Sequence, residues 1–290
     1  MDLVLRNLIG HEAWVFIDDV LIYSDTVEEH AKRLANVFER FRKANLQLQP
    51  EKCAFGKDTV TYLGFELSYR GTEALPDKVK AVQNFPKPRS VKDVRSFLGL
   101  ASFYRRLIPH FADIAKPLTQ LTKKDKIWDW NQECQETFDR LKSKLSSIPV
   151  LAFADFKVPF ILTTDASTVG PGAVLSQVHR GIERPVSFAS RQLNKAERAY
   201  SVSELETLAV VWATKYYRCY LFGKRFLVRT DHAALKFLRN FAENNSHLMR
   251  WSLCLSEFDF EIENVPGSKI KHVDALSRHV GLVEETHLTL

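Results

Sequence analysis

The sequence lacks a hydrophobic run that could cross a membrane. No apolar stretch in its 290 residues approaches the roughly 20 residues that a membrane-spanning helix needs. The opening MDLVLRNLIGHEAW has an acidic residue at position 2 and no basic cluster, which argues against a secretory signal. Only eleven Gly and eleven Pro stand against 20 Phe, which excludes collagen-like, low-complexity and disordered chains. We therefore expect a folded protein with no membrane partner and room for about two domains.

Cysteine is scarce and scattered. No CxxC pair occurs among the four cysteines, Cys53, Cys134, Cys219 and Cys254. A disulfide framework or a zinc site would need a different spacing. We predict buried free thiols in a reducing compartment, and hence an intracellular location, cytoplasmic or nuclear.

Positive charge is concentrated in one segment. Residues 77–126 hold twelve basic and four acidic residues, a net charge of +8, whereas the whole chain carries +6. The rest of the chain is therefore slightly acidic. A basic segment of this kind predicts a surface that binds a polyanion, although an ordinary solvated helical surface would have the same composition.

Hydrophobic patterns divide the chain into three parts and a tail. The boundaries that we predict are 1–75 for an α+β part, 76–150 for a helical part, 151–278 for a mixed α/β part and 279–290 for the tail. The elements expected in the first part are two short strands around Asp18 and Asp19 within 13–24, a helix with Thr26 and Glu29 as a capping box, one strand over 62–67 and a turn at 70–71.

The second and third parts have different patterns. In the helical part we expect a short helix after Pro76 and helices over 90–107, 111–121 and 131–146. In the third part we expect strands over 160–165, 173–178, 184–189, 225–230 and 258–263, a helix over 201–219, helical segments within 232–256 and a short helix near Val273.

Acidic residues stand where the strands of the third part end and where its helices begin. Asp165 and Asp231 each close an apolar strand, Glu204 and Glu206 lie in the first turns of a helix, and Asp274 begins a late helix. Carboxylates that converge from remote segments are typical of a site for a hard divalent cation. Two such ions can assist the cleavage of a phosphodiester bond. Ordinary turn and capping acids would give the same pattern one residue at a time.

Several motifs resemble those of one family. Phe16-Ile17-Asp18-Asp19-Val20 is similar to the palm hairpin of reverse transcriptases, and Tyr62-Leu63-Gly64 to their next palm motif. Residues 97–108 and 114–118 resemble the thumb of gypsy-type LTR retrotransposon Pol polyproteins. The motifs that resemble the RNase H domain of this family lie at 164–167, 200–206, 230–232 and 273–278. The resemblance spans residues 1–278 in the order found in the family.

The resemblance implies a fold and a chemistry. It implies a partial polymerase palm, a helical thumb and connection, and an RNase H-like domain with a mixed five-stranded sheet and flanking helices. The RNase H site that it implies consists of Asp165, Glu206, Asp231 and Asp274, which act as catalytic residues and as ligands of two Mg²⁺ or Mn²⁺ ions. Asp18 and Asp19 correspond to metal ligands of the polymerase site. We expect that site to be incomplete here, because the family takes a further Asp and its fingers from an upstream segment.

The expected activity is cleavage of the RNA strand of an RNA–DNA hybrid. RNA-directed DNA polymerase activity would then belong to a longer parent protein, and a catalytically inactive retroelement remnant that binds nucleic acid is the alternative. The partner would be a hybrid or a template–primer, contacted by Lys92, Arg95, Arg105 and Arg106 of the basic segment. Dimerisation or association with other Pol segments stays open.

Two choices among residues depend on weaker signals. Ser201 with Glu204 fits a capping box, and so does Ser203 with Glu206, so capping alone does not identify the metal ligand. The family's catalytic Glu precedes a pattern that matches residues 206–210, which favours Glu206 over Glu204. For His232 and His272 we expect surface hydrogen bonds, and for Trp128 and Trp130 core packing, with base stacking as the alternative.

Overall fold

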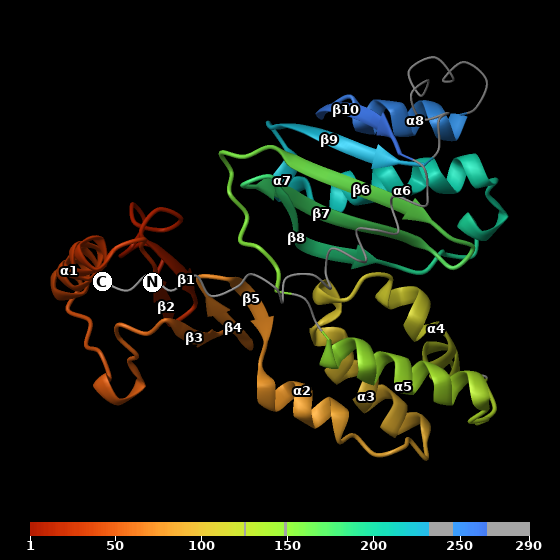
Figure 1. Cartoon of the computed structure of the whole chain (residues 1–290), viewed down its shortest axis with the longest axis horizontal. Helices are drawn as coiled ribbons and strands as arrows, with labels where there is room; N and C mark the ends of the chain where they lie inside the picture. Colours follow the sequence, from red (N-terminus) through yellow and green to blue (C-terminus); the bar gives the residue numbers. More distant parts are fainter. Residues whose placement is uncertain (125, 148–149, 232–245, 266–290) are drawn as a thin grey trace. The chain divides into compact units, whose positions relative to one another are not determined.

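The computed structural model describes residues 1–124, 126–147, 150–231 and 246–265, and Asp274, His232 and His272 lie outside them. The chain forms two compact units, Met1–Leu63 and Gly64–Leu290, which we call the N-terminal and C-terminal units (Figure 1). Within the described residues, no helix is both long and apolar enough to span a membrane.

The N-terminal unit is built on a hairpin and one long helix. Strands β1 (Ala13–Phe16) and β2 (Asp19–Ile22) pair antiparallel around a two-residue turn, as predicted. Ile17 in that turn has a φ of 55°, which suits the right-handed twist of a two-residue hairpin. The other elements of this unit are helix α1 (Val27–Lys43), the 3-10 turn η1 (Pro50–Lys52) and strand β3 (Thr59–Tyr62). Its small core centres on Leu5, Leu8, Val37 and Phe41.

The predicted capping box of α1 is half right. The hydroxyl of Thr26 accepts a hydrogen bond from the Glu29 backbone N–H, as expected. The Glu29 carboxylate, however, accepts from the backbone N–H of Asp25 and pairs with Arg33 at 2.5 Å. The nearby guanidinium, four residues along the helix, draws this carboxylate away from the cap.

The prediction of one strand over 62–67 is wrong. Strand β3 ends at Tyr62 and β4 (Phe65–Ser68) begins three residues later. The intervening Leu63 and Gly64 have φ values of 50° and 80°, so the extended chain is broken there. The turn predicted at Arg70-Gly71 is present, because β4 pairs antiparallel with β5 (Gly71–Ala74).

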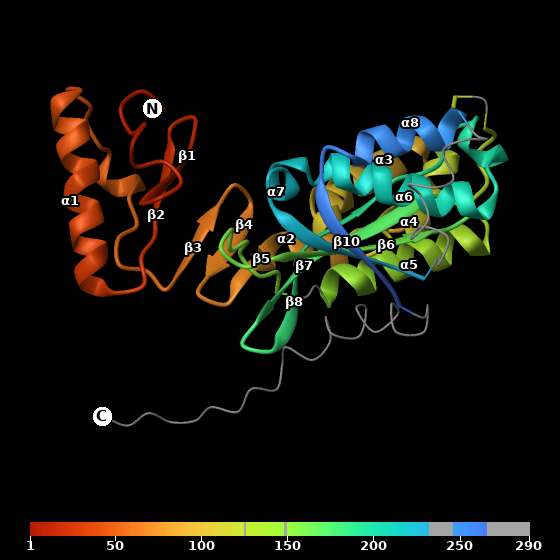
Figure 2. The ribbon, with the colours of Figure 1, turned by 90° about the horizontal axis from the view of Figure 1, so that it is seen from above.

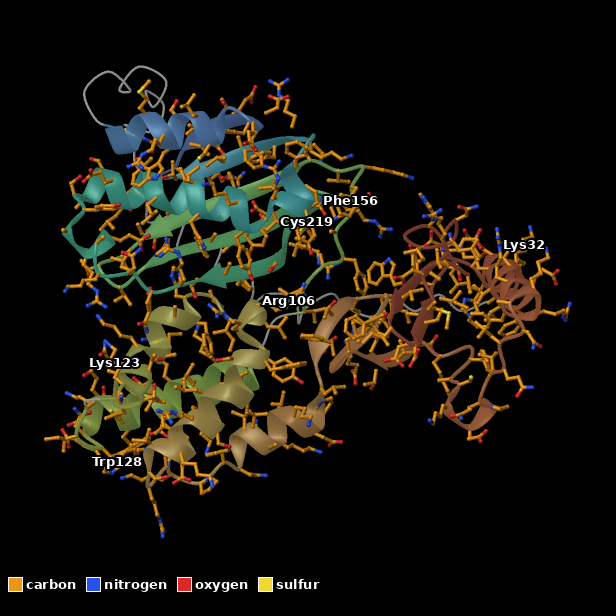
Figure 3. All side chains as sticks on the ribbon, turned by 180° about the vertical axis from the view of Figure 1, so that it is seen from behind. Lys32, Arg106, Lys123, Trp128, Phe156 and Cys219 are labelled. Atoms are coloured by element: carbon orange, nitrogen blue, oxygen red, sulfur yellow. The ribbon has the colours of Figure 1, made fainter. Side chains whose placement is uncertain are left out.

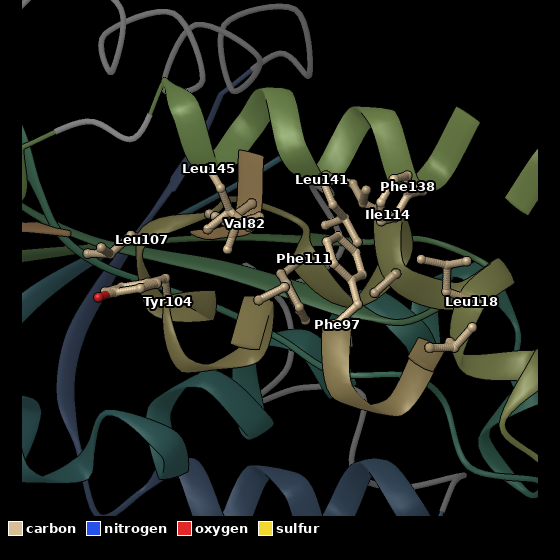
Figure 4. Close-up of a cluster of buried hydrophobic side chains, with 14 of the residues drawn as sticks. Val82, Phe97, Tyr104, Leu107, Phe111, Ile114, Leu118, Phe138, Leu141 and Leu145 are labelled. Carbon is tan, nitrogen blue, oxygen red and sulfur yellow. The ribbon is translucent and has the colours of Figure 1, made fainter. Parts of the chain in front are cut away.

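Helices form the first half of the C-terminal unit. They are α2 (Pro76–Gln83), α3 (Val91–Phe103), the 3-10 turn η2 (Arg105–Leu107), α4 (Phe111–Leu121) and α5 (Gln132–Ser146). The helix predicted over 90–107 therefore ends four residues early, and η2 follows it. Figure 4 shows the apolar cluster between these helices, which includes Phe97, Phe138 and Leu141. Trp128 and Trp130 pack against this cluster, which confirms the core-packing prediction.

The second half of the C-terminal unit is a mixed sheet. Its strands follow the order β10-β9-β6-β7-β8, with β9 parallel to both β6 and β10 and the remaining pairs antiparallel. The strand bounds are Phe160–Ala166 for β6, Pro171–His179 for β7, Ile182–Ser190 for β8, Arg225–Thr230 for β9 and Asp259–Asn264 for β10. The five predicted strands are all present, so the expected mixed five-stranded sheet is confirmed.

Helices pack on this sheet from two directions. The helices that follow β8 are α6 (Val202–Tyr216), α7 (Arg218–Leu221) and α8 (Ser246–Leu255). Helix α6 packs against β6 and β7, and α8 packs against α6 (Figure 2). Turn η2 and helix α4 contact β8 instead, and Phe188 of β8 belongs to the apolar cluster of the first half. The two halves thus share a core.

Burial of the cysteines was predicted only in part. All four thiols are free, as expected, and Cys134 is buried. Cys53 and Cys254 are half-buried, and Cys219 is exposed (Figure 3), so the prediction of four buried thiols is wrong. Cys219 lies in the four-residue helix α7, where the inward position belongs to the buried Leu221.

Candidate active site

Three carboxylates meet at one end of the mixed sheet. Asp165 is the second-to-last residue of β6, Asp231 directly follows β9, and Glu206 lies near the start of α6. One oxygen from each carboxylate lies within 4.8 Å of one from each of the others. The parallel strands β6 and β9 end at the same edge, where α6 begins (Figure 1), and this topology brings the three acids together.

Capping separates the two glutamates of α6. Ser201 is the N-cap residue, and its hydroxyl accepts from the Glu204 backbone N–H while the Glu204 carboxylate accepts from the Ser201 backbone N–H. Ser203 lies inside the helix and so cannot cap it. Glu206 is 5% exposed and faces the other two acids. The structure thus places Glu206, not Glu204, in the acidic cluster.

The surroundings of the cluster disfavour negative charge on two of its acids, Glu206 and Asp165. Burial and the charges of Asp231 and Asp165 raise the pKa of Glu206 to about 8, although a hydrogen bond with the Ala166 backbone acts in the other direction. Burial also raises the pKa of Asp165; the nearby His110 opposes that shift, and Asp231 adds to it. The Oε2 atom of Glu206 is buried and has no hydrogen-bond partner. Clustered carboxylates that include a buried oxygen without a partner fit a hard divalent cation.

A histidine from the helical half lies beside this cluster. His110 precedes α4 and has a φ of 52°, and its Nδ1 atom lies 3.7 Å from the Asp113 carboxylate. Asp113 also accepts a hydrogen bond from the Ser167 hydroxyl at 3.4 Å, just beyond the end of β6. The sequence analysis missed His110, because a lone histidine after a proline carries no local signal and only the packing of α4 on the sheet brings it here.

The two acids of the hairpin have a different setting. Asp18 and Asp19 are both exposed and come from one hairpin, with Asp18 in the turn and Asp19 at the start of β2. Burial and the charge of Asp19 raise the pKa of the Tyr62 hydroxyl, at the end of β3. Within the described ranges, no third His, Cys, Asp or Glu joins the pair as a metal-ligand group.

The four basic residues singled out from the sequence are exposed, but three of them already make contacts within the protein. Lys92 and Arg95 lie on α3, and Arg95 donates to the Thr122 carbonyl at 3.0 Å. Arg105 donates to the Ser190 carbonyl at the end of β8, so it also ties η2 to the sheet. Arg106, which is labelled in Figure 3, has its guanidinium carbon 5.8 Å from the centre of the Phe65 ring.

Comparisons with known proteins agree with this architecture. A family described as the RNase H-like domain found in reverse transcriptase matches residues 155–258, and the reverse transcriptase (RNA-dependent DNA polymerase) family matches residues 1–67. The chain is 43% identical over 288 residues to the Retrovirus-related Pol polyprotein from transposon 297 of Drosophila melanogaster, covering 99% of this chain and 27% of that protein. It is 36% identical over 276 residues to the Transposon Tf2-3 polyprotein of Schizosaccharomyces pombe, covering 93% of this chain and 20% of that one.

Solved structures show the same fold. A foamy viral protease-reverse transcriptase in complex with RNA/DNA hybrid matches with a TM-score of 0.76 and 23% identity, covering 100% of this chain and 39% of that one. The same type of protein in complex with dsDNA matches with a TM-score of 0.74 and 25% identity, covering 91% and 57%. The chain thus spans about a quarter of the length of the polyproteins it matches.

Proposed function

The chain belongs to the reverse transcriptase and RNase H portion of the retrotransposon Pol polyproteins, and on this basis we propose that its C-terminal unit is a metal-dependent endonuclease that cuts the RNA strand of an RNA–DNA hybrid. The observation that carries the proposal is the meeting of Asp165, Glu206 and Asp231 at the sheet end. Each acid comes from a different element, so their approach is a product of the fold rather than of local sequence.

The three carboxylates would hold Mg²⁺, with Asp274 as a proposed fourth ligand. A bound ion of this kind stabilises charge on a phosphodiester and activates the attacking water. The oxygen atoms of the cluster match the ligand preference of Mg²⁺. Glu206, whose pKa is raised to about 8, would have to lose its proton to become a ligand. Metal binding by this chain should therefore release protons below that pH.

The proposed substrate is a nucleic acid with one RNA strand. The helical half of the C-terminal unit supplies a basic surface through α3 and η2, and this half packs directly on β8 of the catalytic sheet. A backbone held on those helices would therefore lie on the same unit as the acids. The foamy viral enzyme with the same fold is described in complex with RNA/DNA hybrid, which supports this choice of partner.

A cleavage assay tests the proposal. The 290-residue chain is incubated with an end-labelled RNA–DNA hybrid and Mg²⁺ or Mn²⁺. We expect endonucleolytic products with 3′-hydroxyl ends, no cleavage in excess chelator and no cleavage of DNA–DNA duplex. A chain that binds the hybrid but never cuts it would favour the alternative, an inactive remnant that binds nucleic acid.

Polymerase activity is a second proposal, and it concerns the polyproteins of which the chain matches a segment. The β1–β2 hairpin and the family match over residues 1–67 support it. The two adjacent acids of that hairpin offer ligands from one side only, whereas in-line nucleotidyl transfer needs both metal ions held rigidly. We expect the 290-residue chain to extend no RNA-templated DNA primer. Extension that disappears in Asp18→Asn and Asp19→Asn variants would contradict this expectation.

A further inference from the structure

The segment from η2 to the first turn of α4 is fastened to the sheet beside the acidic cluster. The hydroxyl of Ser190, at the end of β8, accepts from the Ala112 backbone N–H at 2.9 Å. Arg105 donates to the carbonyl of the same serine. Together with the bond between Ser167 and Asp113, these contacts hold residues 105–113 against the ends of β6 and β8. This segment lies outside residues 155–258, which match the RNase H-like family.

Gly172 shows how close His110 lies to Asp165. Gly172 of β7 is the direct partner of Asp165 in the β6–β7 pairing. A Cβ atom placed on Gly172 would lie only 3.1 Å from Nδ1 and 3.3 Å from Cε1 of His110. The imidazole ring thus occupies the space that a side chain at position 172 would fill. Direct cross-strand neighbours have Cβ atoms about 4.5–5.5 Å apart and on the same face of the sheet, so the ring lies on the face that carries the Asp165 side chain, over the position opposite it.

The position of the His110 ring is also restricted by Asp113 and by the backbone of His110 itself. The Asp113 carboxylate, one helical turn along, lies 3.7 Å from Nδ1. The left-handed backbone of His110 is a conformation that few residues adopt readily, although His, Asn and Asp are enriched there. Asp113 itself is held by the Ser167 hydroxyl. The ring therefore has an orienting partner and a fixed point of attachment.

We propose that His110, supplied by the helical half, is a positioning residue of the acidic site: its ring, seated on Gly172 and oriented by Asp113, fixes the Asp165 carboxylate toward Glu206 and Asp231. This inference rests on the proposed function for the role of the three acids. It predicts that the site needs a residue from outside the RNase H-like segment. The catalytic groups remain the carboxylates, and His110 acts through Asp165.

The first test measures metal binding without catalysis. Mn²⁺ is titrated by calorimetry into the full chain and into His110→Asn, chosen because Asn tolerates the left-handed backbone yet is too short to cover Gly172. We expect the Mn²⁺ dissociation constant to rise three- to tenfold with little change in the melting temperature. His11→Asn, an exposed histidine of the N-terminal unit, is the matched control and should bind Mn²⁺ like the wild type.

Cleavage kinetics add a readout that a merely structural role would not move. In His110→Asn the KM for hybrid should be unchanged, while kcat falls at low metal concentration and recovers at saturating metal. A loss of kcat that no metal concentration restores, or an Mn²⁺ affinity equal to that of the wild type, would overturn the proposal.

The second test displaces the ring without altering His110. Gly172→Ala places a methyl group against the imidazole, whereas Gly99→Ala in α3 meets nothing within 4 Å and serves as the control. We expect Gly172→Ala to weaken Mn²⁺ binding about as much as His110→Asn, and Gly99→Ala to leave it unchanged. The double variant His110→Asn/Gly172→Ala should be no worse than His110→Asn alone, because the group that the methyl displaces is gone. Additive losses would show that the two residues act independently and would overturn the inference.

Asp165→Asn separates this inference from the proposed function. If Asp165→Asn abolishes metal binding and cleavage while His110→Asn changes neither, the function stands and the positioning role is wrong. If the wild-type chain binds no Mn²⁺, both fail. If the wild type binds Mn²⁺ but cuts no hybrid, the proposed function fails, and the effect of His110→Asn on Mn²⁺ affinity still decides the positioning role.

Discussion

The chain carries two groups of acids that a sequence motif marks equally clearly and that the fold treats differently. Asp18 and Asp19 are adjacent, exposed residues of one two-stranded hairpin. Asp165, Glu206 and Asp231 come from two strand ends and a helix, and their oxygens lie within 4.8 Å of one another. The two acids of the hairpin are adjacent in sequence, whereas the triad forms only when β6, β9 and α6 have come together in the fold.

The difference teaches what turns acids into a metal site. Exposed carboxylates on one hairpin are surrounded by water, so holding an ion there gains little. Glu206 is buried with two acids beside it, and its pKa rises to about 8. Burial and the two neighbouring acids thus disfavour the ionised form of Glu206, and a bound cation would stabilise it. Convergence and burial together, rather than the presence of adjacent Asp residues, distinguish the triad.

The largest effect that we expect comes from replacing one acid of the triad. Asp165→Asn removes a ligand but leaves the basic surface intact, so hybrid cleavage should fall by more than about a hundredfold while hybrid affinity stays within twofold. Asp18→Asn and Asp19→Asn should leave the cleavage rate unchanged. Single-turnover cleavage and equilibrium binding of a labelled hybrid measure both quantities.

The hairpin variants are also the control for this experiment, because they make the same chemical change in the other acidic group. Equal losses in Asp165→Asn and Asp18→Asn would mean that the two groups act in one site. A wild-type rate in Asp165→Asn would remove the triad from the mechanism.

Much of the triad could be predicted from the sequence, because strand ends are a local signal. Asp165 and Asp231 each follow an apolar strand, and parallel strands bring such ends to one edge. The choice of Glu206 needed the resemblance to a family, since two capping boxes fit the same stretch. Only the structure shows that Ser201 and Glu204 form the cap.

Other features had no local signal. The left-handed Leu63 that breaks the strand over 62–67 is not one of the residues that usually mark a turn. Arg105 is one of several basic residues in its segment, and its bond to Ser190 forms only when η2 packs on β8. His110 lies near Asp165 for the same reason. Contacts between remote elements determine these roles, and a single sequence does not reveal them.

The second prediction concerns how the stability of the folded chain depends on pH through Glu206. Burial and two neighbouring acids raise the pKa of Glu206 from 4.5 to about 8 in the folded chain. The stability that protonated Glu206 contributes is therefore complete below pH 4.5 and is lost as the pH rises through 8. In chelator at pH 8, Glu206→Gln should raise the free energy of unfolding by on the order of a few kcal/mol, and this gain should vanish near pH 4.5.

Thermal unfolding at several pH values checks this prediction. Glu204→Gln makes the same change two residues away, where a capping box accepts Gln as well as Glu, and it should alter stability by less than about 0.5 kcal/mol. If Glu206→Gln leaves the free energy of unfolding at pH 8 unchanged, then ionised Glu206 does not destabilise the folded chain as we describe. Excess Mg²⁺ should reverse the order of stability, because the Gln variant loses a ligand.

The smallest expected effect concerns the basic surface of the C-terminal unit. Arg106 is exposed and stacks near Phe65, whereas Arg105 also donates to the Ser190 carbonyl. If Arg106 contacts one phosphate, Arg106→Ala should weaken hybrid binding less than tenfold and reduce the slope of log affinity against log salt by about 0.9. Arg106→Lys retains the charge and should retain the slope, so it separates charge from packing.

Arg105→Ala should lower the slope and also the melting temperature, because it removes an anchor between η2 and β8. Fluorescence anisotropy with a labelled hybrid from 50 to about 300 mM salt measures the slopes. Identical slopes in Arg106→Ala and the wild type would place the nucleic acid on another surface, and a binding loss on mutating the hairpin acids instead would move it to the N-terminal unit.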